Sequence, residues 1–165
     1  MYIRKRIPGK DDPFLVDMVV SNFQVRKSVI EMIINMANEV MIVCDSNDTI
    51  IGFVCYRFRI GPTIFVDYVV LDTKHQGKGI ATSFLPVFES HLMKQGIRNV
   101  FGTVDEENTD ALRTFQHWGF KVQGQLGSSI VIQKELTASP SFSAPAASVR
   151  SNSSVRKLST PPSLR

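Results

Sequence analysis

The chain has 165 residues, and its hydrophobic fraction of 43% and charged fraction of 21% are ordinary for a globular protein with one core. No apolar run approaches the roughly 20 residues that cross a membrane, and the first residues lack the apolar stretch of a secretory signal. The net charge is +4, but residues 137–165 hold four basic residues and no acid, so the rest of the chain is formally neutral.

These values disfavour a membrane protein, and we expect a cytoplasmic one. Its two cysteines, Cys44 and Cys55, each lie inside an apolar strand-like run, which is typical of buried free thiols. No spacing of cysteines and histidines suggests a metal site.

Apolar periodicity predicts strands and helices in chain order up to Leu136. The first half is expected to contain a strand in 1–7, a helix starting at Pro13 after a capping Asp12, a helix in 25–37, and two strands within 39–60 that turn at Ser46-Asn47-Asp48. A further strand, 62–72, ends in a continuous apolar run that suggests burial on both faces.

The second half is expected to contain a helix in 79–94, which Pro86 should bend or weaken, a strand in 97–104, a helix in 109–118 with Asn108 as its N-cap, and a hairpin around Gly127. The complete order is β-α-α-β-β-β-α-β-α-β-β. It implies an α/β fold with a mixed, mostly antiparallel sheet and helices on its faces.

Residues 137–165 form a Ser/Pro-rich, basic tail with nine Ser, four Pro and four Ala and no periodicity. Such a composition does not bury a core, so we expect a folded domain at 1–136 and a tail that is disordered unless bound to a partner. Three interpretations stay open for the tail: an inert segment, a segment that folds on a protein partner, or a weak contact with nucleic acid, which is the least favoured.

The stretch HQGKGIA, residues 75–81, joins a strand to a helix through two glycines. The first turn of a helix has unpaired N–H groups and the positive end of the dipole, and Lys78 adds a charge nearby, so the turn suits an anion. Its spacing excludes the P-loop and the dinucleotide-binding fingerprint. The alternative is a plain β–α turn with two structural glycines.

The motif Gln76-Gly77-Lys78-Gly79-Ile80-Ala81 resembles the Q/R-x-x-G-x-G/A motif of the GNAT family of N-acetyltransferases. A second segment, Asn108-x-x-Ala111-x-x-x-Phe115-x-x-x-Gly119-Phe120, is similar to a downstream segment of that family. The resemblance covers roughly residues 1–136 and implies the GNAT (acyl-CoA N-acyltransferase) fold. In that fold the strand before the turn diverges from the next strand and leaves a wedge for the cofactor.

The resemblance also implies acetyl-CoA as co-substrate and a primary amine as acceptor: a small amine, a lysine or a protein N-terminus. The amine attacks the thioester directly. The residues that match cofactor-binding positions of the family are Val69, Val70, Leu71, Gln76, Gly77, Lys78, Gly79, Ile80, Ala81 and Asn108.

Amide formation needs a neutral amine, an N–H donor for the thioester oxygen and a proton for the leaving thiolate. Asp67 matches an acidic position that serves as base in some family members, and its alternative is a salt-bridged carboxylate at a strand end. Phe115 stands where many members have an acid tyrosine, so Tyr68, and after it Tyr56, become substitute candidates for the acid.

Three interpretations stay open for Asp105, Glu106 and Glu107: they attract a cationic amine, they bind a water that acts as the base, or they form a solvated loop. Thr103 stands where members that acetylate ribosomal protein N-termini have an acid, so this subgroup is disfavoured. Phe115 and Thr103 favour a second hypothesis, a catalytically weak or inactive GNAT-fold module that engages a partner through its tail. The intact glycine turn favours the enzyme. A monomer and a homodimer are both compatible with the sequence.

Overall fold

The computed structural model describes residues 1–137, and the tail expected at 137–165 lies outside them apart from Thr137. The strands are β1 (Tyr2–Lys5), β2 (Glu39–Cys44), β3 (Ile50–Ile60), β4 (Thr63–Leu71), β5 (Asn99–Asp105), β6 (Lys121–Leu126) and β7 (Ser129–Glu135). The helices are α1 (Asp12–Asn22), α2 (Lys27–Met36), α3 (Ile80–Lys94) and α4 (Thr109–His117), and the 3₁₀ turn η1 (Thr73–His75) precedes α3. The predicted order of elements is confirmed.

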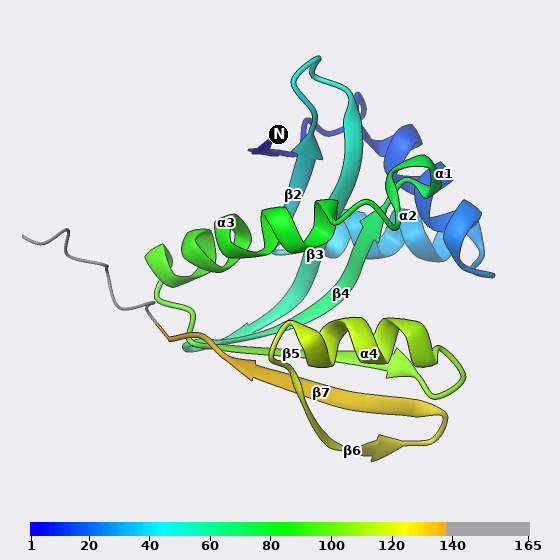
Figure 1. The fold of residues 1–165 in the computed structure, drawn as a ribbon. Coiled ribbons are helices and arrows are strands. Elements are labelled where there is room, and N and C mark those ends of the chain that lie inside the picture. Colours follow the sequence, from blue (N-terminus) through cyan, green and yellow to red (C-terminus); the bar gives the residue numbers. More distant parts are fainter. Residues whose placement is uncertain (138–165) are drawn as a thin grey trace, which may run out of the picture.

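The strands form one seven-stranded sheet in the order β1-β2-β3-β4-β5-β7-β6. Every neighbouring pair is antiparallel except β4 and β5, which run parallel. Helices α1 and α2 cover one face of the sheet, and α3 and α4 lie on the other (Figure 1). The sheet is therefore mixed and mostly antiparallel, as expected. Within residues 1–137, no helix has the length and hydrophobicity needed to cross a membrane.

The core consists of two apolar clusters, one on each face of the sheet. Because side chains alternate along a strand, Phe53 and Cys55 of β3 pack toward α1 and α2, whereas Val54 and Tyr56 pack toward α3. Both cysteines are buried and free, as the sequence indicated. The central strands are thus fixed from both sides, which gives the neighbouring β4 a rigid support.

The parallel pair β4 and β5 stays together for only three residues. Thr63–Phe65 pairs with Asn99–Phe101, after which β4 and β5 continue without a shared ladder. Figure 1 shows the two strands diverging from this point. Beside the divergence, β3 and β4 contain two irregularities in register, and such bulges bend a strand. The wedge that the family resemblance implied is therefore present.

One predicted detail at the start of α1 is wrong. The N-cap is Asp11 rather than Asp12, and its side chain makes no capping hydrogen bond. The carboxylate of Asp11 instead accepts hydrogen bonds from Arg4 at 2.7 and 3.0 Å, and that of Asp12 accepts hydrogen bonds from Arg6 at 2.5 and 2.8 Å. A guanidinium binds a carboxylate more strongly than a neutral N–H does, so the ion pairs take precedence over the cap.

Helix α2 begins at Lys27 and not at Val25, because the preceding Arg26 is extended. Helix α3 is assigned without a break through Pro86. The predicted N-cap of α4 is confirmed, since Asn108 Oδ1 accepts a hydrogen bond from the Ala111 N–H at 3.1 Å. These local details place the first turns of α3 and α4 beside the divergence of the strands.

Candidate active site

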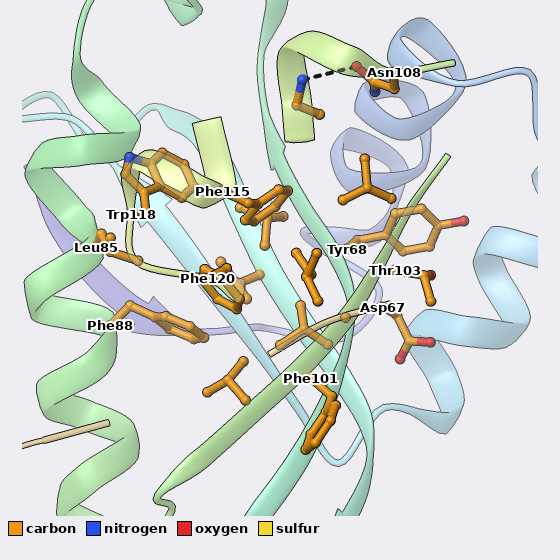
Figure 2. A pocket seen from close by; sticks show the side chains of 18 of the residues that line it. Asp67, Tyr68, Leu85, Phe88, Phe101, Thr103, Asn108, Phe115, Trp118 and Phe120 are labelled. Carbon is orange, nitrogen blue, oxygen red and sulfur yellow. Dashed lines mark hydrogen bonds between the residues drawn. The ribbon is translucent and has the colours of Figure 1, made fainter. Parts of the chain in front are cut away.

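A cavity of about 300 Å³ occupies the space between the diverging strands. Helices α3 and α4 and the short segment after α4 supply an apolar wall that includes Leu85, Phe88, Phe115, Trp118 and Phe120 (Figure 2). The opposite side carries the polar side chains of Asp67, Tyr68 and Thr103. A mostly apolar cavity with a few convergent polar groups is the usual form of a small-molecule site.

Asp67 enters the cavity from a bulge in β4. Tyr56 faces Val66 and Cys55 faces Tyr68, so Asp67 is the extra residue of β4. Arg57 is in turn the extra residue of β3, and its Nε and Nη2 atoms donate to Asp67 Oδ1 at 2.9 and 2.7 Å. Asp67 is therefore a salt-bridged carboxylate, as its alternative interpretation expected, but it lies inside β4 and not at a strand end.

The second oxygen of Asp67 is unusual. Only 6% of the Asp67 side chain is exposed, and its Oδ2 atom is buried without a hydrogen-bond partner within residues 1–137. Buried carboxylate oxygens normally have partners, because leaving one unpaired costs about 1–3 kcal/mol or more. The structure therefore offers a buried acceptor, at the wall of a cavity, to a ligand that can donate a hydrogen bond.

The groups around Asp67 keep their protons or their positive charge at neutral pH. Hydrogen bonding to Asp67 raises the pKa of Arg57 above its ordinary value, against the opposing effect of burial. Burial, followed by the charge of Asp67, raises the pKa of Cys55 to about 12, so the buried thiol does not ionise. Burial, the neighbouring Cys55 and Asp67 also raise the pKa of Tyr68, which leaves its hydroxyl protonated.

Neither tyrosine candidate for the acid is placed like the residue it would replace. Figure 2 shows Tyr68 across the cavity from Phe115, with its hydroxyl pointing away from that ring. The ring of Tyr68 packs against Phe23, with 5.9 Å between the ring centroids. Tyr56 donates to Glu39 Oε2 at 3.0 Å and does not line the cavity. The structure therefore disfavours Tyr56.

Phe115 lies in an aromatic cluster on the other wall. Its ring meets those of Trp118 and Phe120 edge-on, with centroid distances of 5.4 Å in both pairs. Trp118 also donates from its ring nitrogen to the Thr82 hydroxyl at 3.2 Å, which joins α4 to α3. The position of the family tyrosine is thus filled by an apolar ring, held in a packed cluster.

The glycine turn lies outside this cavity, at the N-terminus of α3. Gly77 and Gly79 have φ angles of 70° and 71°, the left-handed conformation that favours glycine. A Cβ atom on either residue would meet no other atom within 4 Å, so the space in front of the turn is open. Gly79 caps α3 without a side-chain hydrogen bond, and the first amides of the helix stay available to an anion.

Gln76 anchors the turn to two other elements. Its Nε2 atom donates to Asn22 Oδ1 at 2.5 Å and to the Leu71 carbonyl at 3.0 Å. Asn22 is the last residue of α1, and Leu71 is the last residue of β4. The turn is therefore held against both by a side chain that the sequence analysis had placed among the cofactor-binding residues.

The structure gathers the predicted site residues into two regions. The cavity contains Asp67, Tyr68, Val69 and Asn108. The side chain of Val70 packs into the α1 and α2 core, which leaves its backbone for a ligand. The remaining predicted residues lie around the turn: Leu71, Gln76, Gly77, Lys78, Gly79, Ile80 and Ala81.

Of the acids expected after the fifth strand, Asp105 is the last residue of β5 and lines the cavity, and its Oδ1 atom accepts a hydrogen bond from the Glu107 N–H at 2.9 Å. Glu106 accepts a hydrogen bond from Gln125 Nε2 at 2.5 Å and is tied to β6. The sequence analysis missed Arg57. In the sequence, Arg57 and Asp67 lie at similar distances on either side of the turn at Gly61-Pro62, which is compatible with an ion pair across a hairpin. Only the register of β3 and β4 shows that the two side chains meet.

An open mixed sheet whose parallel pair diverges beside a glycine turn at a helix N-terminus defines the acyl-CoA N-acyltransferase class of fold. The model of the acetyltransferase (GNAT) family matches residues 14–120, and the chain belongs to this family.

Among curated proteins, the chain is 28% identical over 99 residues to the L-2,4-diaminobutyric acid acetyltransferase of Methylotuvimicrobium alcaliphilum, which covers 59% of this chain and 58% of that protein. It is 25% identical over 75 residues to the spermine/spermidine N(1)-acetyltransferase of Bacillus subtilis, which covers 43% of this chain and 49% of that protein. The chain therefore matches only about half the length of these relatives.

Among solved structures, an aminoglycoside 6'-N-acetyltransferase complexed with coenzyme A superposes with a TM-score of 0.69 at 14% identity. The superposition covers 85% of this chain and 99% of that one. At this identity the likeness shows the shared fold.

Proposed function

We propose that the protein is an acetyl-CoA-dependent N-acetyltransferase that transfers an acetyl group to a primary amine. The observation that carries this proposal is the divergence of β4 from β5 beside an open glycine turn at the start of α3. The named relatives support it, because they are acetyltransferases of diaminobutyric acid and of spermine and spermidine, and the structural neighbour contains coenzyme A.

In this proposal, the backbone N–H groups of Gly77 to Ala81 and the side chain of Lys78 hold the diphosphate. The stretch Val69–Leu71 pairs with β3 but has no ladder partner toward β5. The Leu71 carbonyl accepts a hydrogen bond from Gln76, so the groups of Val69 and Val70 that face β5 are the ones that would bind the pantetheine amides and the thioester oxygen. Asn108, which caps α4 and lines the cavity, would also bind the pantetheine part of the cofactor. The residues present fit acetyl-CoA at each of these points.

Acetyl-CoA supplies the thioester when it is bound. The amine nitrogen forms a bond to the thioester carbon, the carbon–sulfur bond breaks, the amine loses one proton, and the thiolate gains one. Asp67 Oδ2 is the acceptor for the amine's hydrogen, and Asp67 is the candidate base. Tyr68 is the candidate acid, although a thiolate is a stable leaving group and needs little assistance.

The alternative is a GNAT-fold module without efficient chemistry, which engages a partner through residues 137–165. The observation that favours it is Phe115, whose ring offers no proton to the thiolate. In either case we place the protein in the cytoplasm, where two free cysteines stay reduced.

Calorimetric titration with acetyl-CoA tests the proposal. The native protein should bind, and Gly79→Glu should bind at least about tenfold more weakly, because a carboxylate would stand at the anion site. Gly127→Glu is the matched control, since Gly127 is also left-handed, with a φ of 59°, and open, but lies in the β6–β7 turn. Absence of binding by the native protein would end the enzyme proposal. Binding without turnover of any amine or peptide would favour the module.

A further inference from the structure

An apolar groove of about 240 Å³ lies beside the cavity, where β3, β4 and β5 leave the cover of the helices. Its lining residues are Phe58, Ile60, Thr63, Ile64, Phe65 and Phe101. Phe58 is 58% exposed and Ile60 is 81% exposed. Large apolar side chains that gather at the surface mark an interaction site more often than single ones do.

The groove follows one row across three strands. Phe58 faces Phe65 in the β3–β4 pair, and Phe65 faces Phe101 in the β4–β5 pair, so the three rings lie on the same face of the sheet. This is the face toward α1 and α2, because the intervening Ile64 packs with the core on the α3 side. The row ends on β5, one of the two diverging strands between which the cavity lies.

Two residues connect the groove to the buried carboxylate of Asp67. Phe101 lines both the groove and the cavity. The guanidinium of Arg57 lies 5.4 Å from the centre of the Phe58 ring and at the same time holds Asp67 Oδ1. Figure 2 shows Thr103, Asp67 and Phe101 following one another at this end of the cavity. The aromatic row is therefore in contact with the Arg57–Asp67 ion pair, whose Oδ2 atom is itself buried.

The chemistry of this surface selects an occupant with two parts. Asp67 Oδ2 calls for a hydrogen-bond donor, and a positively charged amine also complements its charge. The groove favours the binding of a hydrocarbon group, because five of its six lining residues are apolar. A second ammonium group placed there would lose its hydration without gaining a partner.

Resting on the proposed function, we infer that the acceptor is a primary amine that carries an apolar substituent. The amine donates to Asp67 Oδ2, and the alkyl or aryl group lies over Phe101, Phe65 and Phe58. The preferred acceptor therefore differs from a polyamine, in which a second ammonium group follows the reacting one along the chain.

A matched pair of acceptors tests this inference. Hexylamine and 1,6-diaminohexane share one carbon chain, and only the diamine would place an ammonium group in the groove. We expect kcat/KM for hexylamine to exceed that for the diamine by at least about tenfold, a size typical of apolar discrimination in enzyme pockets. Equal values, or a preference for the diamine, would overturn the inference.

Variants locate the effect in the groove. Ile60→Ser should raise KM for hexylamine about fivefold, roughly the effect of one or two methylene groups, and leave KM for the diamine unchanged. Phe14→Ser is the control, because Phe14 is 61% exposed but lies on α1. If Ile60→Ser affects both amines equally, the groove does not contact the acceptor. Ile60→Ser leaves the contact between Arg57 and Phe58 intact, so it separates the groove from the Asp67 ion pair.

Two further measurements separate this inference from the proposed function. Failure to bind acetyl-CoA contradicts the proposed function. The affinity of the two amines for the protein in the presence of coenzyme A, measured by calorimetry, tests the groove even without turnover, and again the monoamine should bind tighter. Sedimentation velocity tests the alternative that a second copy of the chain occupies the groove. A native dimer that Ile60→Ser converts to a monomer would assign the groove to a second copy of the chain and overturn the inference.

Discussion

Arg57 and Asp67 meet across two facing bulges, and both donating nitrogens of the guanidinium bind the same carboxylate oxygen, Oδ1. An end-on pair of this kind satisfies half of the carboxylate. The other half, Oδ2, is left buried at the cavity wall, where a bidentate pair would have consumed it.

This geometry predicts that Asp67→Asn lowers kcat/KM by about 10²–10⁴-fold, the usual contribution of a general base. Acetyl-CoA binding should be unchanged, because Asp67 is not part of the glycine turn. Steady-state kinetics and calorimetry measure the two effects. Arg57→Gln should produce a smaller loss, mainly in kcat, since the carboxylate stays but is no longer oriented. Full activity of Asp67→Asn would remove it from the mechanism.

Replacing Phe115 by tyrosine restores a hydroxyl at the family's acid position. We expect Phe115→Tyr to raise kcat, by up to about 10²-fold if protonation of the thiolate limits the rate. Phe120→Tyr adds a hydroxyl to the same aromatic cluster and should give no gain. If Phe115→Tyr changes nothing while Tyr68→Phe lowers kcat, the acid is Tyr68. The effects of Phe115→Tyr and Tyr68→Phe are both measured from the pH dependence of kcat.

Stability at low pH should depend on Asp11. Hydrogen bonds from Arg4, against the opposing effect of burial, lower the pKa of Asp11 below its ordinary value of 3.8, and the Ile7 N–H acts in the same direction. Because the folded-state pKa lies below the unfolded one, this contribution is complete above pH 3.8 and is lost as the pH falls through the folded value.

Asp11→Asn should therefore lower the free energy of unfolding by about 1–3 kcal/mol at pH 7, since Arg4, which is 22% exposed, loses its charged partner but stays in contact with water. The variant should also lose less stability than the native protein between pH 4 and pH 2. Urea unfolding followed by circular dichroism measures both. Asp110→Asn is the control, because the Asp110 side chain is 94% exposed and should change neither value. Parallel pH curves for Asp11→Asn and the native protein would contradict the assignment.

Gly52 allows β3 to approach the end of β4. A Cβ atom there would lie 2.6 Å from the Val70 carbonyl oxygen and 2.6 Å from Leu71 Cδ2. Gly52→Ala should therefore destabilise the fold by about 1–3 kcal/mol and weaken acetyl-CoA binding, because the backbone of Val69–Leu71 must move. Gly124→Ala, whose Cβ meets nothing within 4 Å, should do neither. Thermal unfolding and calorimetry give the comparison.

The features that the sequence predicted well depend on short stretches of chain. The glycine turn and the Asn108 cap need only neighbouring residues, so their residue types identify them. The cap of α1 was misplaced by one residue, because Asp11 and Asp12 are both suitable caps. Both carboxylates accept hydrogen bonds from an arginine, Arg4 or Arg6, on the far side of a turn, and neighbouring residues give no signal for these contacts.

The features that the sequence did not predict depend on register. The bulges that bring Arg57 to Asp67 each shift the β3–β4 pairing by one residue, and local patterns carry no signal for such a shift. The position of β7 between β5 and β6 is likewise a matter of sheet topology. The aromatic row of Phe58, Phe65 and Phe101 follows from two strand pairings at once, so it emerges only from the assembled sheet.

The hydrogen bonds of Gln76 to Asn22 and Leu71 connect the glycine turn to the wall of the cavity. Asn22 immediately precedes Phe23, which lines the cavity, so a single side chain links the two regions of the site. In the proposed function, a displacement of the turn on cofactor binding would therefore reach Phe23 through Gln76.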